Sequence, residues 1–114
     1  MMDDLTATRL CAEAMGLEHR VVDNSYVECK PPPLDARWWL TYYPLHDDAQ
    51  AMALVKRFRI NICWYEVNMP GGFEPTVYMW DRKPEELNRE VVYCVAKMQA
   101  AKVAAIRDGG HDEI

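Results

Sequence analysis

The stretch Ile60–Asp81, INICWYEVNMPGGFEPTVYMWD, decides how this chain folds. Two runs rich in aromatic and aliphatic residues flank a Pro-Gly-Gly turn, and this pattern predicts two strands joined as a hairpin. A strand alternates its side chains between the two faces of a sheet, and both runs carry apolar side chains at successive positions. We therefore expect a sheet that is covered on both faces.

A helix is predicted immediately before this pair of strands. Asp47 can cap the helix start, and Gln50 can reach back to the cap as in a capping box. The predicted buried stripe has the spacing i, i+3, i+4, i+7 and comprises Ala51, Leu54, Val55 and Phe58.

A longer helix is predicted after the pair, from Pro84 to about Ile106. Its predicted buried stripe comprises Leu87, Val91, Cys94, Val95 and Met98. Further apolar residues widen this stripe, namely Val92, Tyr93 and Ala96. The extra width indicates either deep burial or a contact with a second copy of the chain.

The N-terminal part predicts a helix and a short hairpin. Asp3 or Asp4 can accept hydrogen bonds from the first free backbone amides of a helix. Asp4–Met15 has small apolar residues at helical spacing, and Gly16 can end the helix in the left-handed conformation. His19–Val22 and Ser25–Cys29 flank Asp23-Asn24, two residues that tolerate the positive φ angles of a tight turn.

The segment Arg37–Tyr43 (RWWLTYY) follows a triple proline. Its alternation favours a further strand, and the alternative is an irregular segment that lays aromatic rings over an edge of the core. The element order therefore predicts an α+β fold, a mostly antiparallel sheet of four to five strands covered by three helices as an α-β-α sandwich. We expect one domain over residues 1–107 and a flexible tail over 108–114.

The charge balance limits the classes of partner. The chain of 114 residues carries 18 acidic and 13 basic side chains, a net charge of −5. This balance opposes direct binding of nucleic acid and suits a basic surface on another protein. No apolar run approaches the roughly 20 residues that span a bilayer. Because Asp3 and Asp4 stand where a signal peptide carries basic residues, we expect a cytoplasmic protein without a membrane partner.

No pattern in the sequence predicts catalysis. The four cysteines contain no C-x-x-C pair, so neither a metal site nor a redox motif is expected. The three histidines are His19, His46 and His111, and none accompanies a nucleophile. Paired acids such as Glu85-Glu86 stand at helix starts, where the helix dipole accounts for them. We expect a protein without cofactor that is not an enzyme.

The connection between the two strands is the first candidate contact site. Asn68–Pro75 is long for a hairpin connection and places the apolar Met69 and Phe73 in a loop, which either binds a partner or folds back over the core. Aromatic rings elsewhere in the chain could stack on nucleic acid, but they are not interleaved with basic residues. The predicted protein-binding residues are Met69, Phe73, Glu74, Trp38, Trp39 and Tyr43.

Four features resemble a group of small phage and prophage proteins, the phage ABA-sandwich domain proteins and the similar NinX-like proteins. They are the helix end Cys11–Leu17 (CAEAMGL), the aromatic segment Trp39–Pro44, the helix start Asp47–Met52 (DDAQAM), and the hairpin followed by a closing helix. The resemblance implies a three-layer α-β-α architecture and a phage accessory role, with no catalytic site.

Three functional hypotheses follow. The first is a phage protein that binds a host or phage protein, such as a nucleoprotein defence complex, and inhibits it by covering its basic surface as an anti-CRISPR-type factor. The second is a small-molecule or nucleotide binder, or an enzyme, with a pocket beside Trp64, Tyr78 and Trp80. The third is a homodimeric structural protein joined through the long helix.

Overall fold

The computed structural model of the protein describes residues 2–30, 38–66 and 74–109. Among these residues it contains three helices and five strands, so the predicted α+β class is confirmed. In chain order the elements are α1 (Asp4–Ala14), β1 (Glu18–Val22), β2 (Tyr26–Lys30), β3 (Leu40–Tyr42), α2 (Asp48–Phe58), β4 (Asn61–Cys63), β5 (Thr76–Tyr78), a 3-10 turn (Pro84–Glu86) and α3 (Leu87–Gly109).

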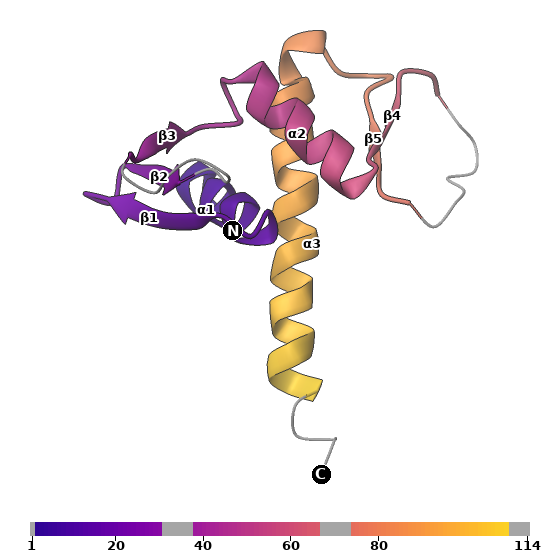
Figure 1. The fold of residues 1–114 in the computed structure, drawn as a ribbon. Coiled ribbons are helices and arrows are strands. Elements are labelled where there is room, and N and C mark those ends of the chain that lie inside the picture. The colour runs from indigo at the N-terminus through magenta and orange to yellow at the C-terminus, as the bar shows by residue number, and fades with distance from the viewer. Residues whose placement is uncertain (1, 31–37, 67–73, 110–114) are drawn as a thin grey trace.

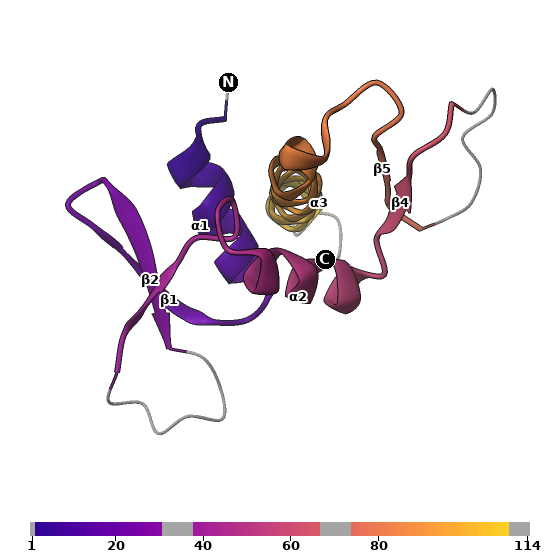
Figure 2. The same cartoon turned by 90° about the horizontal axis from the view of Figure 1, so that it is seen from above.

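The long helix α3 is the central element. It runs between α1 with β1–β3 on one side and β4–β5 on the other, and α2 crosses it near its N-terminal half (Figure 1). Seen along α3, the two groups of strands lie well apart on either side of the helix (Figure 2). The strands thus form two sheets, one of three strands and one of two.

The buried face of α3 differs slightly from the predicted stripe. Its fully buried residues are Val91, Val92, Val95 and Ala96. The predicted stripe included Met98, which is 38% exposed, and Cys94, which is only half-buried. The buried face differs from the predicted stripe because α1 packs on it, and the small residues of α1 allow the two helices to approach closely. The Cys11 thiol donates a hydrogen bond to the Val92 carbonyl oxygen of α3 over 3.3 Å.

Both ends of α1 follow the sequence prediction. The Asp3 carboxylate accepts a hydrogen bond from the Thr6 amide over 2.8 Å and caps the first turn. Gly16 has φ +72°, the left-handed conformation that ends the helix. Ala7, Cys11 and Ala12 are completely buried, which is how this helix contributes to the core.

The three-stranded sheet confirms the first hairpin. β1 and β2 are antiparallel, and Asp23 and Asn24 take φ angles of 52° and 54° in the turn between them. β3 adds to β2 with Tyr42 opposite Val27. The predicted strand over residues 37–43 is therefore real but shorter, and residues 31–37 lie outside the described part of the chain.

The capping prediction for α2 is half right. Asp47 accepts from the Gln50 amide over 3.0 Å, as predicted. The Gln50 side chain does not reach back to the cap. It accepts from the Tyr43 amide over 2.6 Å and donates to the Thr41 carbonyl oxygen over 3.2 Å, because the end of β3 lies within its reach. Gln50 therefore joins α2 to the edge of the sheet.

The antiparallel hairpin predicted for Ile60–Asp81 is wrong. β4 and β5 are parallel, with Asn61 opposite Thr76, Ile62 opposite Val77 and Cys63 opposite Tyr78. Parallel strands need a connection of about a dozen residues, and the chain between these strands is long enough to return to the same end. Its residues 67–73 lie outside the described part.

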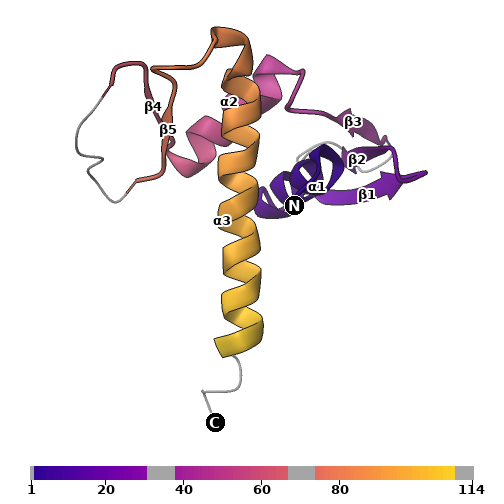
Figure 3. The same ribbon diagram turned by 180° about the vertical axis from the view of Figure 1, so that it is seen from behind.

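The prediction that this sheet is covered on both faces is also wrong. The inner face is buried, with Val77 4% and Met79 1% exposed. On the other side Tyr65 is 80% exposed and Trp80 51% exposed. Seen from behind, α2 and α3 lie against only one side of the pair (Figure 3).

The C-terminal half of α3 projects from the rest of the molecule (Figures 1 and 3). It continues to Gly109, so the predicted start of the tail at residue 108 lies in the helix, and residues 110–114 are outside the described part. Among the described residues, no helix combines the length and the apolar character needed to cross a membrane.

Candidate protein-binding groove

The predicted contact residues do not form one site. Met69 and Phe73 lie outside the described residues. Glu74 is exposed beside β5 and accepts a hydrogen bond from the Asn61 side chain over 3.3 Å. Trp38 and Trp39 directly precede β3, which lies on the opposite side of α3 (Figure 1). The structure therefore separates the predicted residues into two groups.

The aromatic residues near β3 have different surroundings. The Trp39 ring lies against two cations, with the Arg20 guanidinium 4.1 Å and the Lys30 ammonium 4.6 Å from its centroid. Tyr43 packs its ring on His46, 4.6 Å between centroids. Trp38, 74% exposed, presents most of its surface to solvent. Trp39 and Tyr43 thus have intramolecular roles that already account for them.

A second group of exposed aromatic residues follows from the parallel pairing. Trp64 and Tyr65 come directly after β4, and Trp80 comes two residues after β5. Parallel strands have their C-terminal ends at the same end of a sheet, so all three residues lie at that end. Their exposed fractions are 44%, 80% and 51%. Sequence reasoning missed this arrangement because it assumed strands that run in opposite directions.

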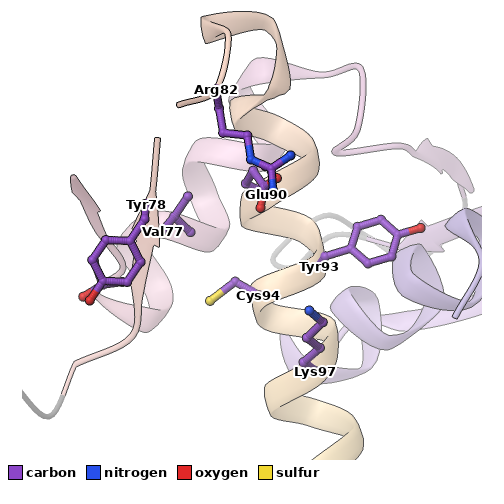
Figure 4. Close-up of a pocket in the computed structure, with 8 residues that line it drawn as sticks. Val77, Tyr78, Arg82, Glu90, Tyr93, Cys94 and Lys97 are labelled. Atoms are coloured by element: carbon purple, nitrogen blue, oxygen red, sulfur yellow. The ribbon is translucent and has the colours of Figure 1, made fainter. Parts of the chain in front are cut away.

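A groove of about 460 Å³ separates β5 from α3 (Figure 4). Its α3 wall has the spacing i, i+3, i+4, i+7, which places Glu90, Tyr93, Cys94 and Lys97 on one side of the helix. Its other wall is strand β5, and Arg82 stands near one end. The Cys94 side chain points across the groove toward β5 (Figure 4).

The β5 wall of the groove is an open strand edge. The Asn61 amide donates to the Pro75 carbonyl oxygen over 2.8 Å, and the Met79 amide donates to the Cys63 carbonyl oxygen over 2.7 Å. Since backbone groups alternate along a strand, Val77 also faces β4, whereas Thr76 and Tyr78 direct their N–H and C=O groups away from it. Among the described residues, these groups form no hydrogen bond outside the strand pair.

Charged side chains surround the groove. Arg82 Nε lies 3.6 Å from Glu90 Oε1 and 3.8 Å from Asp81 Oδ1. Lys97 has no ion pair with any described residue. A neighbouring hollow of about 230 Å³ is lined by Arg82, Arg89, Glu90, Tyr93 and Lys97 and continues the groove around α3. The groove therefore offers, beside an open strand edge, an ammonium group that no described residue pairs with.

Tyr93 is held in place by the start of α1. Its hydroxyl donates a hydrogen bond to the Asp4 carboxylate, and this bond raises the pKa of Tyr93. Arg89 Nη1 lies 3.0 Å from the same carboxylate, and the Arg89 guanidinium lies 4.8 Å from the Tyr93 ring centroid. These contacts connect α1 to the groove wall.

The chemistry of the groove favours binding. Burial raises the pKa of the Cys94 thiol, the opposite of the change that activates a thiolate nucleophile. In the described part of the chain, no three side chains of the metal-binding types come together to hold an ion. The groove provides the backbone hydrogen-bond donors and acceptors of β5, the side chains of Tyr78 and Cys94, and the Lys97 cation.

The fold and this groove define an α+β protein with an open parallel strand edge beside a helix. No family model, curated protein or solved structure matches the chain. The resemblance to phage ABA-sandwich proteins stays a prediction.

Proposed function

We propose that the protein is a binding module that accepts an extended segment of another protein as a third strand beside β5. The observation that carries this proposal is the open edge of Thr76 and Tyr78, which faces the groove along α3. Strand addition uses main-chain hydrogen bonds for affinity and side-chain pockets for specificity.

The groove favours a segment with an acidic side chain. Lys97 lines it without an ion pair among the described residues, while the Arg82 charge is already offset by Glu90 and Asp81. A carboxylate on the added strand would complement Lys97. The half-buried Tyr78 and the exposed Trp80 would flank the added strand and supply the large aromatic contacts common at protein interfaces.

The experiment compares two substitutions at one position. Peptides are selected from a display library of random decapeptides against the full chain, and their binding is measured by calorimetry. Thr76→Pro removes the N–H that faces the groove and leaves the ladder to β4 intact, so we expect about 3- to 10-fold weaker binding. Thr76→Val keeps the N–H and is the matched control.

Charge reversal at two lysines of α3 is the second half of the test. Lys97→Glu should weaken the binding of acidic peptides by up to about fivefold, whereas Lys102→Glu, farther along α3, should leave their binding unchanged. Amide chemical shifts should change at Thr76 and Tyr78. Peptides that bind Thr76→Pro and Thr76→Val equally well would contradict the proposal.

A narrower form of the proposal names the partner as a nucleic-acid-binding defence protein. Its support is the net charge of −5 together with the resemblance to phage proteins. Under this proposal the protein covers a basic surface in the bacterial cytoplasm and competes with nucleic acid. Binding to such a partner should weaken as salt rises, and added nucleic acid should displace the protein.

A nucleotide is the second candidate ligand, since Tyr78, Arg82 and Lys97 line the same groove. A stacking ring and two cations suit a base and its phosphates. Trp64 and Trp80, expected to form this pocket, are absent from its lining. A nucleotide at 100 times its dissociation constant should add about 2.7 kcal/mol to the unfolding free energy, measurable as a thermal shift.

A further inference from the structure

A second hollow lies on the other side of α3 from the groove. It has a volume of about 440 Å³, within the range typical of small-molecule sites. Its walls come from three places: the end of α1, the strands β2 and β3, and the side of α2 that faces them. The lining residues are Met15, Leu17, Cys29, Leu40, Tyr42, Gln50, Ala53 and Arg57.

The sheet wall of this pocket is apolar but incompletely covered. Cys29 lies opposite Leu40 and Val27 opposite Tyr42, so these four side chains share one face of the sheet. Cys29 and Tyr42 are buried, with 3% and 4% exposed, whereas Leu40 on the same face is 47% exposed. The burial of this face thus ends at Leu40, where the pocket opens.

The opposite wall is helix α2, which side-chain hydrogen bonds join to the sheet. Gln50, Ala53 and Arg57 have the spacing i, i+3, i+7 and lie on one side of α2. The Gln50 amide bonds to both Tyr43 and Thr41 at the end of β3, which ties α2 to the sheet beside the pocket. Because its oxygen and nitrogen are both engaged, Gln50 does not dominate the polarity of the pocket.

One charged group lies beside this apolar pocket. The Tyr42 hydroxyl is buried behind the pocket lining, out of reach of solvent. Arg57 is exposed and has no ion pair or side-chain hydrogen bond within the described part.

We propose that this pocket binds a small carboxylic acid with an apolar body, whose carboxylate meets Arg57. The apolar lining takes the body, and the guanidinium supplies two donors for the carboxylate. This site is independent of the groove beside β5.

The test titrates octanoate into the full chain and follows its binding by amide chemical shifts and calorimetry. The amide signals of Leu40, Ala53 and Arg57 should shift.

Arg57→Gln tests the carboxylate end, and neighbouring Lys56→Gln is the matched control. Arg57→Gln should weaken the binding of octanoate about tenfold and leave the binding of uncharged 1-octanol unchanged. Lys56→Gln, which removes a charge outside the pocket lining, should change neither.

The proposal is overturned by any of three results. The first is no binding of octanoate at millimolar concentration. The second is equal losses from Arg57→Gln and Lys56→Gln. The third is a set of nuclear Overhauser contacts showing that residues of the chain itself occupy the pocket.

Discussion

Cys63 lies directly opposite Tyr78 in two strands that run in the same direction, and the amide after Tyr78 donates to the Cys63 carbonyl oxygen over 2.7 Å. This register has two consequences. It places Trp64, Tyr65 and Trp80 at the C-terminal end of the two strands. It also turns the backbone of Thr76 and Tyr78 toward the groove, which is why we assign partner binding to β5.

The cysteines should differ in accessibility. Cys63 and Cys94 are half-buried, whereas Cys11 and Cys29 are buried. We expect iodoacetamide to modify Cys63 and Cys94 in the folded protein and the other two only after unfolding in urea, as mass spectrometry of the peptides would show. Modification of Cys11 before Cys94 in the folded protein would contradict the packing of α1 on α3.

Stability should fall in alkaline solution partly through Cys11. Burial raises the pKa of the Cys11 thiol to about 12, above its value of about 8.5 in an unfolded chain. The folded state therefore holds this proton while the unfolded state loses it. The resulting stabilisation is complete below about pH 8.5 and is lost between there and about pH 12, at up to about 1.4 kcal/mol per pH unit.

The Cys11→Ala variant isolates this contribution. At neutral pH the variant has a lower unfolding free energy because a buried sulfur is lost. Its stability should nevertheless fall less steeply than that of the original chain between pH 8.5 and 10, as measured by urea denaturation. Equal slopes would show that Cys11 ionises normally in the folded state.

Leu54 should be a major contributor to the core. It is completely buried on α2, whereas Met52 on the same helix is 42% exposed. Leu54→Ala should lower the unfolding free energy by about 2–5 kcal/mol, and the control Met52→Ala should change it by less than about 0.5 kcal/mol. Urea denaturation measures both, and similar losses would contradict the orientation of α2.

The hydrogen bonds of Gln50 should protect the end of β3. Gln50→Ala removes the acceptor for the Tyr43 amide, so hydrogen exchange at Tyr43 should become faster. Asp47→Ala removes the cap of α2 and should lower the unfolding free energy by about 1 kcal/mol without this local effect on Tyr43. Unchanged exchange at Tyr43 in Gln50→Ala would contradict the contact.

The projecting end of α3 tests the homodimer hypothesis. Ile106 is 65% exposed and Val103 38% exposed there. If two copies associate through this surface, Ile106→Asp should convert a dimer to a monomer in analytical ultracentrifugation while the unfolding free energy of the monomer stays unchanged. A natural chain that is monomeric at all accessible concentrations would exclude this mode of association.

Much of the candidate site lay beyond what the sequence could predict. Lys97 and Cys94 belong to a helix that was expected, yet nothing in the spacing of α3 indicates that β5 lies across a groove from them. The loop Met69–Phe73, the expected contact site, was chosen because of its composition, and most of the groove residues have no such distinguishing pattern. The pocket around Tyr42 likewise joins residues from α1, the sheet and α2.

Local chemistry was sufficient to predict elements whose signals are short-range. Asp3 and Asp47 cap their helices, Gly16 ends α1, and Asp23-Asn24 forms the first turn, because each interaction spans only a few residues. The α+β class followed from the order of these elements. The direction of β5 beside β4, the backbone groups that Gln50 reaches and the buried face of α3 depend on contacts between distant segments. Packing decides such contacts, since the same strand pattern is compatible with either direction of pairing.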